Sequence, residues 1–527
     1  MRRTSGLMDA LKTLNSHELW LAFQALDKTA LSYDLLRATA ALSIGYVIIK
    51  CIYNRYFHPL AKFPGPFLAS ITEFYHIYLY LTVAAEHIVD EELHRKYGPV
   101  VRKAPNFLII NDASMIPVVY SKNAWKPDMF YVPEGFGRTN VPVAFFQKDP
   151  KEHTISRRRI TPPFSPKSMT AMKPIIQTRV SEWTAKNKKY ADSGKAIDWT
   201  EWTQALAYDV LSELVFGEPF GFIATESDVH GLLREFYQAI PYAGTLVRLP
   251  WLVKWITSLP FAGAMLPDPS DKRGMGKIMG IRDAHINHRL QNPTNKPDIL
   301  NHLLSYKNED GSPIPLPVIK FEALVMMNAG SETTASTLCC FVLNILRFPH
   351  IYKKLMAGDL STENISSPDP QFRYLSAVIK ETLRWTHPAP SLFPRLISGN
   401  GVVLPDGRHI PAGAVVNINI QLAMRDKKVF GEDAEEFVPE RWLVESGWGS
   451  PEAIKHMEQY NFVWGYGPRM CVGKPLAEAE LLMATKELLV NFVPELVNPE
   501  KPYSRMTNYT TIVHEGFYIR LRNRTEA

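Results

Sequence analysis

The sequence predicts one large, mainly helical domain with a small β-rich part, placed behind an apolar N-terminal segment. Residues 318–347 are typical of one long helix, and residues 209–221 and 225–290 of further helices. Two extended stretches, 402–404 and 414–420, flank turns that contain proline and glycine, which predicts a small sheet. No Gly/Ser-rich linker, low-complexity tract or repeat divides the chain after its N-terminal region. We therefore expect a single domain.

Composition supports a large folded core and argues against nucleic-acid binding. The chain has 527 residues, of which 46% are hydrophobic and 21% charged, so wholesale disorder is disfavoured. Its net charge of +6 is only mildly basic, and the basic residues form neither one long run nor a nucleic-acid motif. This balance favours a basic face toward an acidic protein or an anionic membrane.

The four cysteines argue against a disulfide framework. They have neither CxxC nor zinc-finger spacing, and Cys339 and Cys340 are adjacent on the long helix. Cys51 lies in the apolar N-terminal segment. A reducing compartment fits this pattern, and Cys471 remains for a chemical role.

The apolar segment at residues 35–53 predicts a membrane anchor. Its length of about 19 residues is near what a helix needs to span a bilayer. Lys50, Arg55 and Lys62 place its C-terminal side in the cytosol, so residues 1–34 are expected to be lumenal. A buried core helix or an interfacial helix is the alternative. A cleaved signal peptide is disfavoured, because a largely polar stretch precedes the segment and no small-residue cleavage site follows.

Residues 54–68 read as a stiff hinge that aims the rest of the chain relative to the membrane. Three prolines and a glycine within residues 59–66 resist both a helix and a central strand. The remaining residues, 69–527, form the predicted folded domain.

A loop at residues 464–473 holds the most informative motif. Cys471 has Gly467 four residues before it, Arg469 two residues before it and Gly473 two residues after it, and a helix follows. Such a loop exposes a sulfur while backbone N–H groups at the helix start point toward it, which favours the thiolate. Arg469 offers a positive charge to a carboxylate on the same ligand. A thiolate ligand with a carboxylate anchor suits haem, and the flanking residues disfavour the alternative of a structural thiol.

This spacing resembles the haem-binding signature of the cytochrome P-450 family, with Trp464 where that family usually has Phe. The resemblance implies the family fold, which is mainly α with a small β-rich subdomain. It also implies haem b, with Cys471 as the axial ligand of the iron. Trp464, Gly467, Arg469 and Gly473 are then cofactor-binding residues.

Further basic residues match the propionate ligands of that family. His153 and Arg157 are four residues apart and share a helix face. They resemble the family's propionate-gripping helix, in which Trp and Arg occupy these positions, and Arg395 matches another propionate ligand. Arg158 and Arg159 are more typical of a solvated helix face, which could also contact an acidic reductase.

The middle of the long helix, residues 328–334, reads Asn-Ala-Gly-Ser-Glu-Thr-Thr. Small residues there would let a flat cofactor approach the backbone, and hydroxyls can bend a helix. The segment matches the family's oxygen-activation pattern, which implies that Glu332 and Thr333 relay protons as catalytic residues. Taken alone, the motif would favour a packed helix.

A structural lock is expected behind the haem loop. Glu381 and Arg384 lie on one helix face, where such pairs usually contribute little. The family buries this pair and joins it to a later arginine, which here is Arg441.

The substrate pocket is assigned by resemblance, with ordinary packing as the alternative for its aromatic residues. Helices separated by Pro241 and Pro250 would form a mobile lid over it. The candidate lining residues are Phe130, Phe136, Asn328, Ala329, Leu392, Phe393 and Ile512.

The resemblance implies a monooxygenase that hydroxylates or otherwise oxidises an apolar small molecule. It would use O2 and NADPH through a separate NADPH–cytochrome P-450 reductase, with cytochrome b5 as an additional donor. We expect a single-pass protein of the endoplasmic reticulum membrane, in contact with lipid, with a cytosolic catalytic domain.

The hinge and residues 94–102 look similar to fungal pisatin-demethylase-like and secondary-metabolism members, which implies a terpenoid, polyketide or alkaloid substrate. Detoxification of a plant phenolic is the alternative within the same chemistry. A haem-thiolate isomerase or dehydratase without a reductase, and a non-catalytic haem-binding membrane protein, are the alternatives from other classes.

Overall fold

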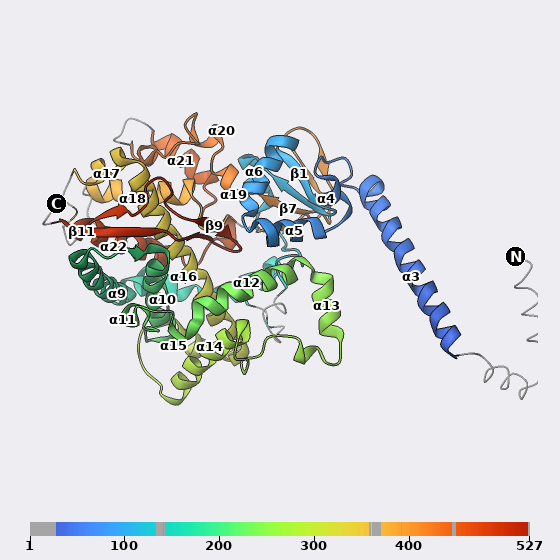
Figure 1. The fold of residues 1–527 in the computed structure, drawn as a ribbon, viewed down its shortest axis with the longest axis horizontal. Helices are drawn as coiled ribbons and strands as arrows, with labels where there is room; N and C mark the ends of the chain where they lie inside the picture. The colour runs from blue at the N-terminus through green and yellow to red at the C-terminus, as the bar shows by residue number, and fades with distance from the viewer. Residues whose placement is uncertain are drawn as a thin grey trace, which may run out of the picture.

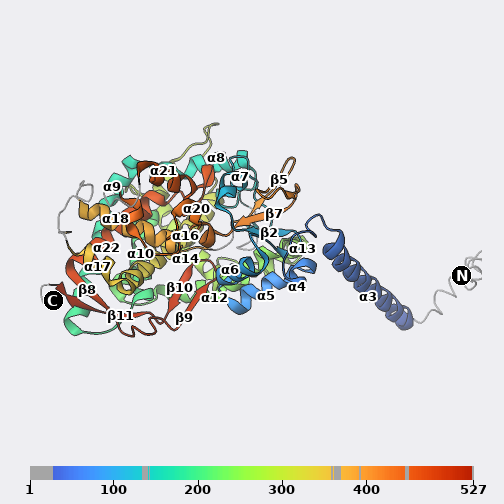
Figure 2. The ribbon, with the colours of Figure 1, turned by 90° about the horizontal axis from the view of Figure 1, so that it is seen from above.

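The computed structural model describes residues 28–132, 141, 143–357, 360, 370–390, 393–444 and 450–524. Most of these residues form one body of helices, with small sheets at its side and one long helix that projects from it (Figures 1 and 2). The predicted architecture, mainly helical with a small β-rich part, is confirmed.

The projecting helix is α3 (Lys28–Ile52), which continues as a π-helical turn at Tyr53–Phe57. Within it, Ser32–Phe57 is long and apolar enough to cross a membrane, with a mean hydropathy of 1.7, and none of its most apolar window is buried against the protein. This span contains the predicted residues 35–53. A core helix would be covered by protein, so the alternative of a buried helix is wrong.

The proline-rich hinge is packed against the body. Leu60 and Phe63 are buried in the core beside the sheets. Pro64 accepts a hydrogen bond of 2.7 Å from the backbone N–H of Arg102. A side chain at Gly65 would lie 2.2 Å from the carbonyl oxygen of Arg102, so only glycine permits this approach. Packing against the body, in addition to the stiffness of its prolines, therefore fixes the position of the hinge.

Two helices form the centre of the body. The long helix α16 (Leu316–Arg347) extends the predicted 318–347 by two residues, and it packs along α10 (Trp199–Phe216). The sequence predicted α10 only over its last turns and extended it to residue 221. Asp198 caps its true start by accepting from the N–H groups of Thr200 and Glu201. Gly217, with φ of 81°, ends it.

The predicted lid consists of α12 (Leu232–Arg248), α13 (Pro250–Ser258) and α14 (Gly274–Gln291). Pro250 is the first residue of α13. The backbone N–H at that position has no partner within a helix, so proline is tolerated there. The prediction that Pro241 separates two helices is wrong, because Pro241 lies inside α12. Tertiary contacts hold α12 together there: the carbonyl oxygen of the preceding residue, Ile240, accepts from the hydroxyl of Tyr80 at 3.1 Å.

The remaining longer helices surround this centre (Figures 1 and 2). They are α5 (Phe74–Val83), α6 (Glu86–Tyr97), α8 (Pro150–Ile160), α9 (Pro166–Ser193), α15 (Ile299–Ser305), α17 (Pro349–Leu355), α18 (Pro370–Trp385), α21 (Pro451–Tyr460) and α22 (Lys474–Asn491). The short helices are α4 (Phe67–Ile71), α7 (Ile116–Val119), α11 (Phe222–Thr225), α19 (Ile420–Ala423) and α20 (Lys427–Phe430).

The largest sheet has the strand order β1 (Val100–Ala104), β2 (Phe107–Ile110), β7 (Val415–Ile418) and β4 (Arg395–Leu396). Strands β1 and β2 are antiparallel neighbours and form a hairpin. The sequence predicts one small sheet from the stretches at 402–404 and 414–420, but they lie in two different sheets. Strand β7 pairs in parallel with β2, whereas β5 (Val402–Val403) pairs with β6 (His409–Ile410). The other strands are β3 (Ile197–Asp198), β8 (Phe492–Leu496), β9 (Arg505–Asn508), β10 (Ile512–Glu515) and β11 (Tyr518–Asn523).

Candidate functional site

The loop before α22 presents the thiol of Cys471. A 3-10 turn at Gly467–Arg469 shapes it, and the N–H of Cys471 donates to the carbonyl oxygen of Trp464 at 2.7 Å. Gly467 has φ of 63°, a left-handed conformation that glycine adopts without strain. Cys471 is exposed, while the other two cysteines of the body, Cys339 and Cys340, are buried. The loop therefore leaves one sulfur open to a ligand.

The loop alone does not favour the thiolate, contrary to the sequence prediction. Burial of its surroundings raises the pKa of the Cys471 thiol. The backbone N–H groups of Gly473 and Lys474 and the charge of Arg157 act in the opposite direction but do not overcome it. A coordinated metal ion deprotonates a thiol outright. A metal ion bound by this sulfur would therefore add to what the helix start contributes to the thiolate.

The predicted propionate ligands come together from three parts of the chain. His153 and Arg157 lie on α8, Arg395 on β4 and Arg469 in the loop. Burial, together with the charges of Arg469, Lys126, Arg157 and Arg395, lowers the pKa of His153 to about 3. We call these five side chains the cationic cluster.

The cationic cluster lacks counter-charges, so a dianionic ligand fits it. Arg469 donates to the carbonyl oxygens of Gln147 (2.8 Å) and Lys148 (3.1 Å), and Arg395 donates to the hydroxyl of Tyr131 (3.2 Å). The Nε of Arg395 is buried without a partner. Over the described ranges, no ion pair joins the cluster to a carboxylate. Buried cations without counter-charges are costly, so the two propionates of haem fit here.

Lys126 is the member of the cationic cluster that the sequence analysis missed. It is 6% exposed, and its ammonium lies over the rings of Tyr131 (4.1 Å) and Phe145 (4.7 Å). It also donates to the carbonyl oxygen of Phe145. Burial lowers its pKa well below the usual value. The only signal in the sequence is a single lysine within an aromatic stretch, Trp125 to Tyr131, which predicts no partner.

Replacing Lys126 by methionine is expected to change the haem-free and haem-loaded proteins in opposite directions. The haem-free chain gains stability, because a buried cation beside other cations is removed. Haem binds about 10- to 100-fold more weakly, the factor for one charge-assisted hydrogen bond. Urea unfolding and haem titration measure the two effects. The exposed Lys122, changed to methionine, is the control and should change neither; equal haem affinity in Lys126→Met would contradict the assignment.

Glu332 and Thr333 are neighbours on α16, but their side chains lie in different surroundings. The hydroxyl of Thr333, which is half-buried, donates to the carbonyl oxygen of Ala329 at 2.8 Å. The carboxylate of Glu332 is buried and accepts from Tyr208 (2.9 Å), Gln204 (3.3 Å) and Tyr237. Burial raises the pKa of Glu332. The acid is therefore held on the α10 and α12 side of the long helix.

Small residues on α16 permit close packing at this point. A side chain at Gly330 would lie 2.9 Å from a methyl group of Leu211 on α10. The side-chain amide of Asn328 donates to Leu324 O at 2.9 Å, and Ala329 is exposed.

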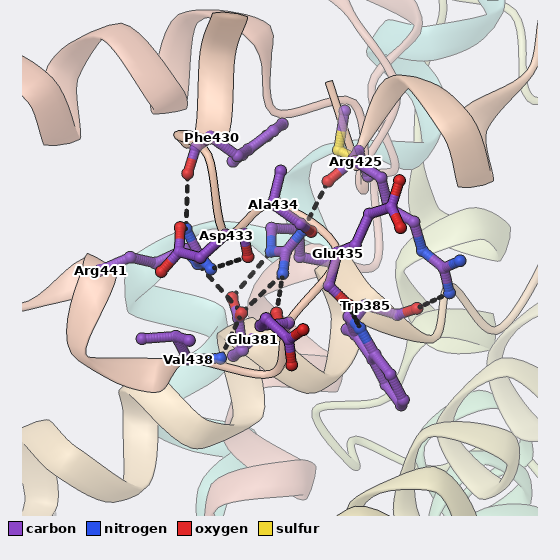
Figure 3. A network of polar contacts seen from close by, with 12 residues as sticks. Glu381, Trp385, Arg425, Phe430, Asp433, Ala434, Glu435, Val438 and Arg441 are labelled. Atoms are coloured by element: carbon purple, nitrogen blue, oxygen red, sulfur yellow. Dashed lines mark hydrogen bonds and ion pairs between the residues drawn. The ribbon is translucent and has the colours of Figure 1, made fainter. Parts of the chain in front are cut away.

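Figure 3 shows the network of Glu381, Arg384 and Arg441, all three of which are completely buried. Arg384 binds the Glu381 carboxylate in a fork, at 2.7 and 2.8 Å, and Arg441 donates to the same carboxylate at 3.0 Å. The indole N–H of Trp442 (2.9 Å) and the N–H of Val438 (2.9 Å) complete it. Both guanidinium groups also bind backbone carbonyl oxygens of the segment from Met424 to Glu436. The network ties α18 to that segment, as a structural lock would.

The predicted pocket residues have varied surroundings. Phe130 has φ of 69° and packs near His76 and Phe107. Phe393 is half-buried and donates its N–H to Asn417 Oδ1 at 2.8 Å. Ile512 is 2% exposed on β10. Phe136 and Leu392 lie outside the described residues.

The chain is similar to known proteins of one family. The family described as Cytochrome P450 matches residues 64–516. The chain is 28% identical to "Quiannulatic acid synthase" from Emericella variicolor, over 83% of this chain and 88% of the relative. It is 29% identical to "Cytochrome P450 monooxygenase aba1" from Botryotinia fuckeliana (84% and 88%) and 29% identical to "Cytochrome P450 monooxygenase gsfF" from Penicillium aethiopicum (89% and 95%).

The match covers the hinge end, the long helix, the buried lock and the cysteine loop, so the resemblance of the separate motifs is confirmed as membership. Cysteine as the ligand of haem iron characterises this family. The chain therefore belongs to the cytochrome P450 family and is a haem-thiolate monooxygenase.

Proposed function

We propose that the protein binds haem b through Cys471 and uses NADPH and O2 to hydroxylate, or otherwise oxidise, an apolar small molecule. The exposed thiol of Cys471, set in a glycine-bounded loop with an unpaired cationic cluster, carries this proposal. When bound, haem would supply the activation of oxygen.

The residues of the chain would hold the cofactor and manage protons. His153, Lys126, Arg157, Arg395 and Arg469 would bind the two propionates by charge-assisted hydrogen bonds. Trp464, Gly467 and Gly473 would shape the loop around the sulfur. Thr333 would orient a proton at its hydroxyl, and Glu332, whose pKa burial raises, would supply it. The helices of the lid would exclude water from the pocket.

Electrons would come from a separate NADPH–cytochrome P-450 reductase, with cytochrome b5 as an additional donor. Use of a redox partner is general in this family. The basic helix α8, with Arg158 and Arg159 in its last turn, offers positive charge to an acidic partner.

We place the protein in the endoplasmic reticulum membrane, with residues 1–34 lumenal, an anchor at 35–53, a hinge at 54–68 and a cytosolic catalytic domain at 69–527. The bare apolar helix α3 supports the anchor. Exposed apolar residues on α4 and α13 support lipid contact, since both helices lie on the α3 side of the body (Figures 1 and 2). They are Phe67, Leu68, Trp251 and Trp255.

For the substrate, we propose an intermediate of fungal secondary metabolism, of the terpenoid, polyketide or alkaloid class. The relative from Emericella variicolor is named as the synthase of quiannulatic acid, which supports a biosynthetic role. Detoxification of a plant phenolic is the second candidate. Metabolite profiles of a strain that lacks the gene and of its parent test this: a biosynthetic enzyme should leave its substrate accumulated. Unchanged profiles, with increased sensitivity to a plant phenolic, would favour detoxification.

Replacing Thr333 by alanine is expected to divert reducing equivalents from product to peroxide. Without its hydroxyl, proton delivery slows, so product formed per NADPH should fall about tenfold or more, given the 10²–10⁴ that a positioned acid contributes. Peroxide and product are measured during NADPH oxidation. Thr337→Ala removes a hydroxyl that bonds to the Thr333 carbonyl oxygen one turn further along, and it should couple like the wild type. Unchanged coupling in Thr333→Ala would remove Thr333 from the relay.

A further inference from the structure

A short stretch of chain, residues 143–148, supplies backbone carbonyl oxygens to two members of the cationic cluster. The ammonium of Lys126 donates to the carbonyl oxygen of Phe145. The guanidinium of Arg469 donates to the carbonyl oxygens of the last two residues of the stretch, at 2.8 and 3.1 Å. We call residues 143–148 the carbonyl segment. Its position decides where these two basic side chains lie.

Two consecutive residues of α16 hold the carbonyl segment against the long helix. Glu322 Oε1 accepts a hydrogen bond of 2.8 Å from the backbone N–H of Ala144. The ring of Phe321 stacks on that of Phe146, with centroids 5.5 Å apart and planes inclined by only 7°. All four residues are buried. The segment is therefore anchored by one buried polar contact and one apolar contact.

An acid at the position of Glu322 is not explained by packing. Burial raises the pKa of its carboxyl to about 7, although the charges of Arg159 and Arg157 on α8 act in the opposite direction. Within the described part of the chain, no ion pair balances its charge, so an apolar side chain would be easier to bury. Such a side chain would leave the N–H of Ala144 buried without a partner, which is costly. Either protonation state of Glu322 keeps an oxygen that accepts from this N–H.

We propose that Glu322 is a positioning residue of the cofactor site. It holds the carbonyl segment against α16, and the segment in turn places Lys126 and Arg469 where they can bind the propionates of haem. Glu322 thus acts on the cofactor through other residues. The proposal rests on the role proposed above for the cationic cluster.

Haem transfer from the full-length holoenzyme in detergent to an excess of apomyoglobin measures how firmly each variant holds its haem. Glu322→Leu should lose haem about tenfold faster than the wild type, the factor for one buried hydrogen bond to an ionisable group. Glu322→Gln keeps an acceptor oxygen, so it should lose haem no faster than the wild type. If Glu322→Gln loses haem as fast as Glu322→Leu, the proposal is overturned.

The double variant with Lys126→Met separates positioning from general stability. When Glu322 acts through Lys126, most of its effect disappears once that lysine is gone. The double variant should therefore lose haem at most about threefold faster than Lys126→Met alone. Two effects that simply multiply, or an unchanged rate in Glu322→Leu, overturn the proposal. If Lys126→Met itself loses haem like the wild type, the role of the cationic cluster fails, and this proposal fails with it.

Glu309→Leu is the matched control. This exposed carboxylate pairs with Arg158 of α8 and lies outside the carbonyl segment, so the variant should hold haem like the wild type. If Glu322→Leu does not fold, amide hydrogen exchange of the wild-type holoenzyme decides. The N–H of Ala144 should exchange slowly, and rapid exchange there would show that Glu322 does not hold the segment.

Discussion

Replacing Cys471 by alanine should abolish the carbon-monoxide band of the reduced protein that gives the family its name. That band requires a thiolate on the iron, and Cys471 has the only exposed sulfur among the described cysteines of the catalytic domain. Turnover should fall to background, because the loss of the ligand removes the electron density that favours O–O cleavage. The spectrum and product formation are measured on the same preparation.

Cys51→Ala is the control for this variant. Cys51 lies on the apolar helix α3, outside the catalytic domain, so both the band and turnover should be retained. A Cys471→Ala protein that keeps the band would show that another residue binds the iron. Loss of bound haem together with the band would support the assignment, since the cationic cluster alone holds only the propionates.

Replacing Glu381 by glutamine is expected to cost about 3–5 kcal/mol, the range for removing one partner of a buried ion pair. The amide has nearly the same shape but no charge, so the guanidinium groups of Arg384 and Arg441 stay buried without a counter-charge. This loss is a large part of the stability of a typical domain. We expect a lower urea midpoint and little folded protein in cells.

The exposed pair of Lys427 and Glu432 provides the matched control. Its two charges lie 3.4 Å apart at the surface, so Glu432→Gln should change stability by less than about 1 kcal/mol. If Glu381→Gln were as stable as Glu432→Gln, the buried lock would not stabilise the segment before the cysteine loop.

The sequence predicted the parts of the site whose residue types are rare in their setting. A cysteine flanked by Gly467, Arg469 and Gly473 restricts the chemistry strongly. The pair Glu381 and Arg384 was assigned to a buried lock through the resemblance to the family. Lys126 was missed because nothing in its neighbours distinguishes a buried lysine from an exposed one. Its burial between two aromatic rings depends on chain segments brought together by folding.

The errors in the predicted fold have a similar origin. Local propensity predicted a helix boundary at Pro241, but contacts with α5 hold α12 together across it. It also placed the stretches at 402–404 and 414–420 in one small sheet, whereas β7 pairs with β2, more than three hundred residues earlier. Strand pairing depends on distant partners, which a short stretch does not reveal.

By itself, the sequence determined the fold class, the apolar N-terminal helix, the long central helix and the loop that presents Cys471. Those features follow from length, periodicity and motif spacing, which are local. Only the tertiary structure decided that four basic side chains converge on a neutral His153 and that Glu332 faces α10 and α12. In the folded chain alone do the surroundings of Cys471 raise the pKa of its thiol. These properties depend on burial and on charges from distant segments, and both exist only in the folded chain.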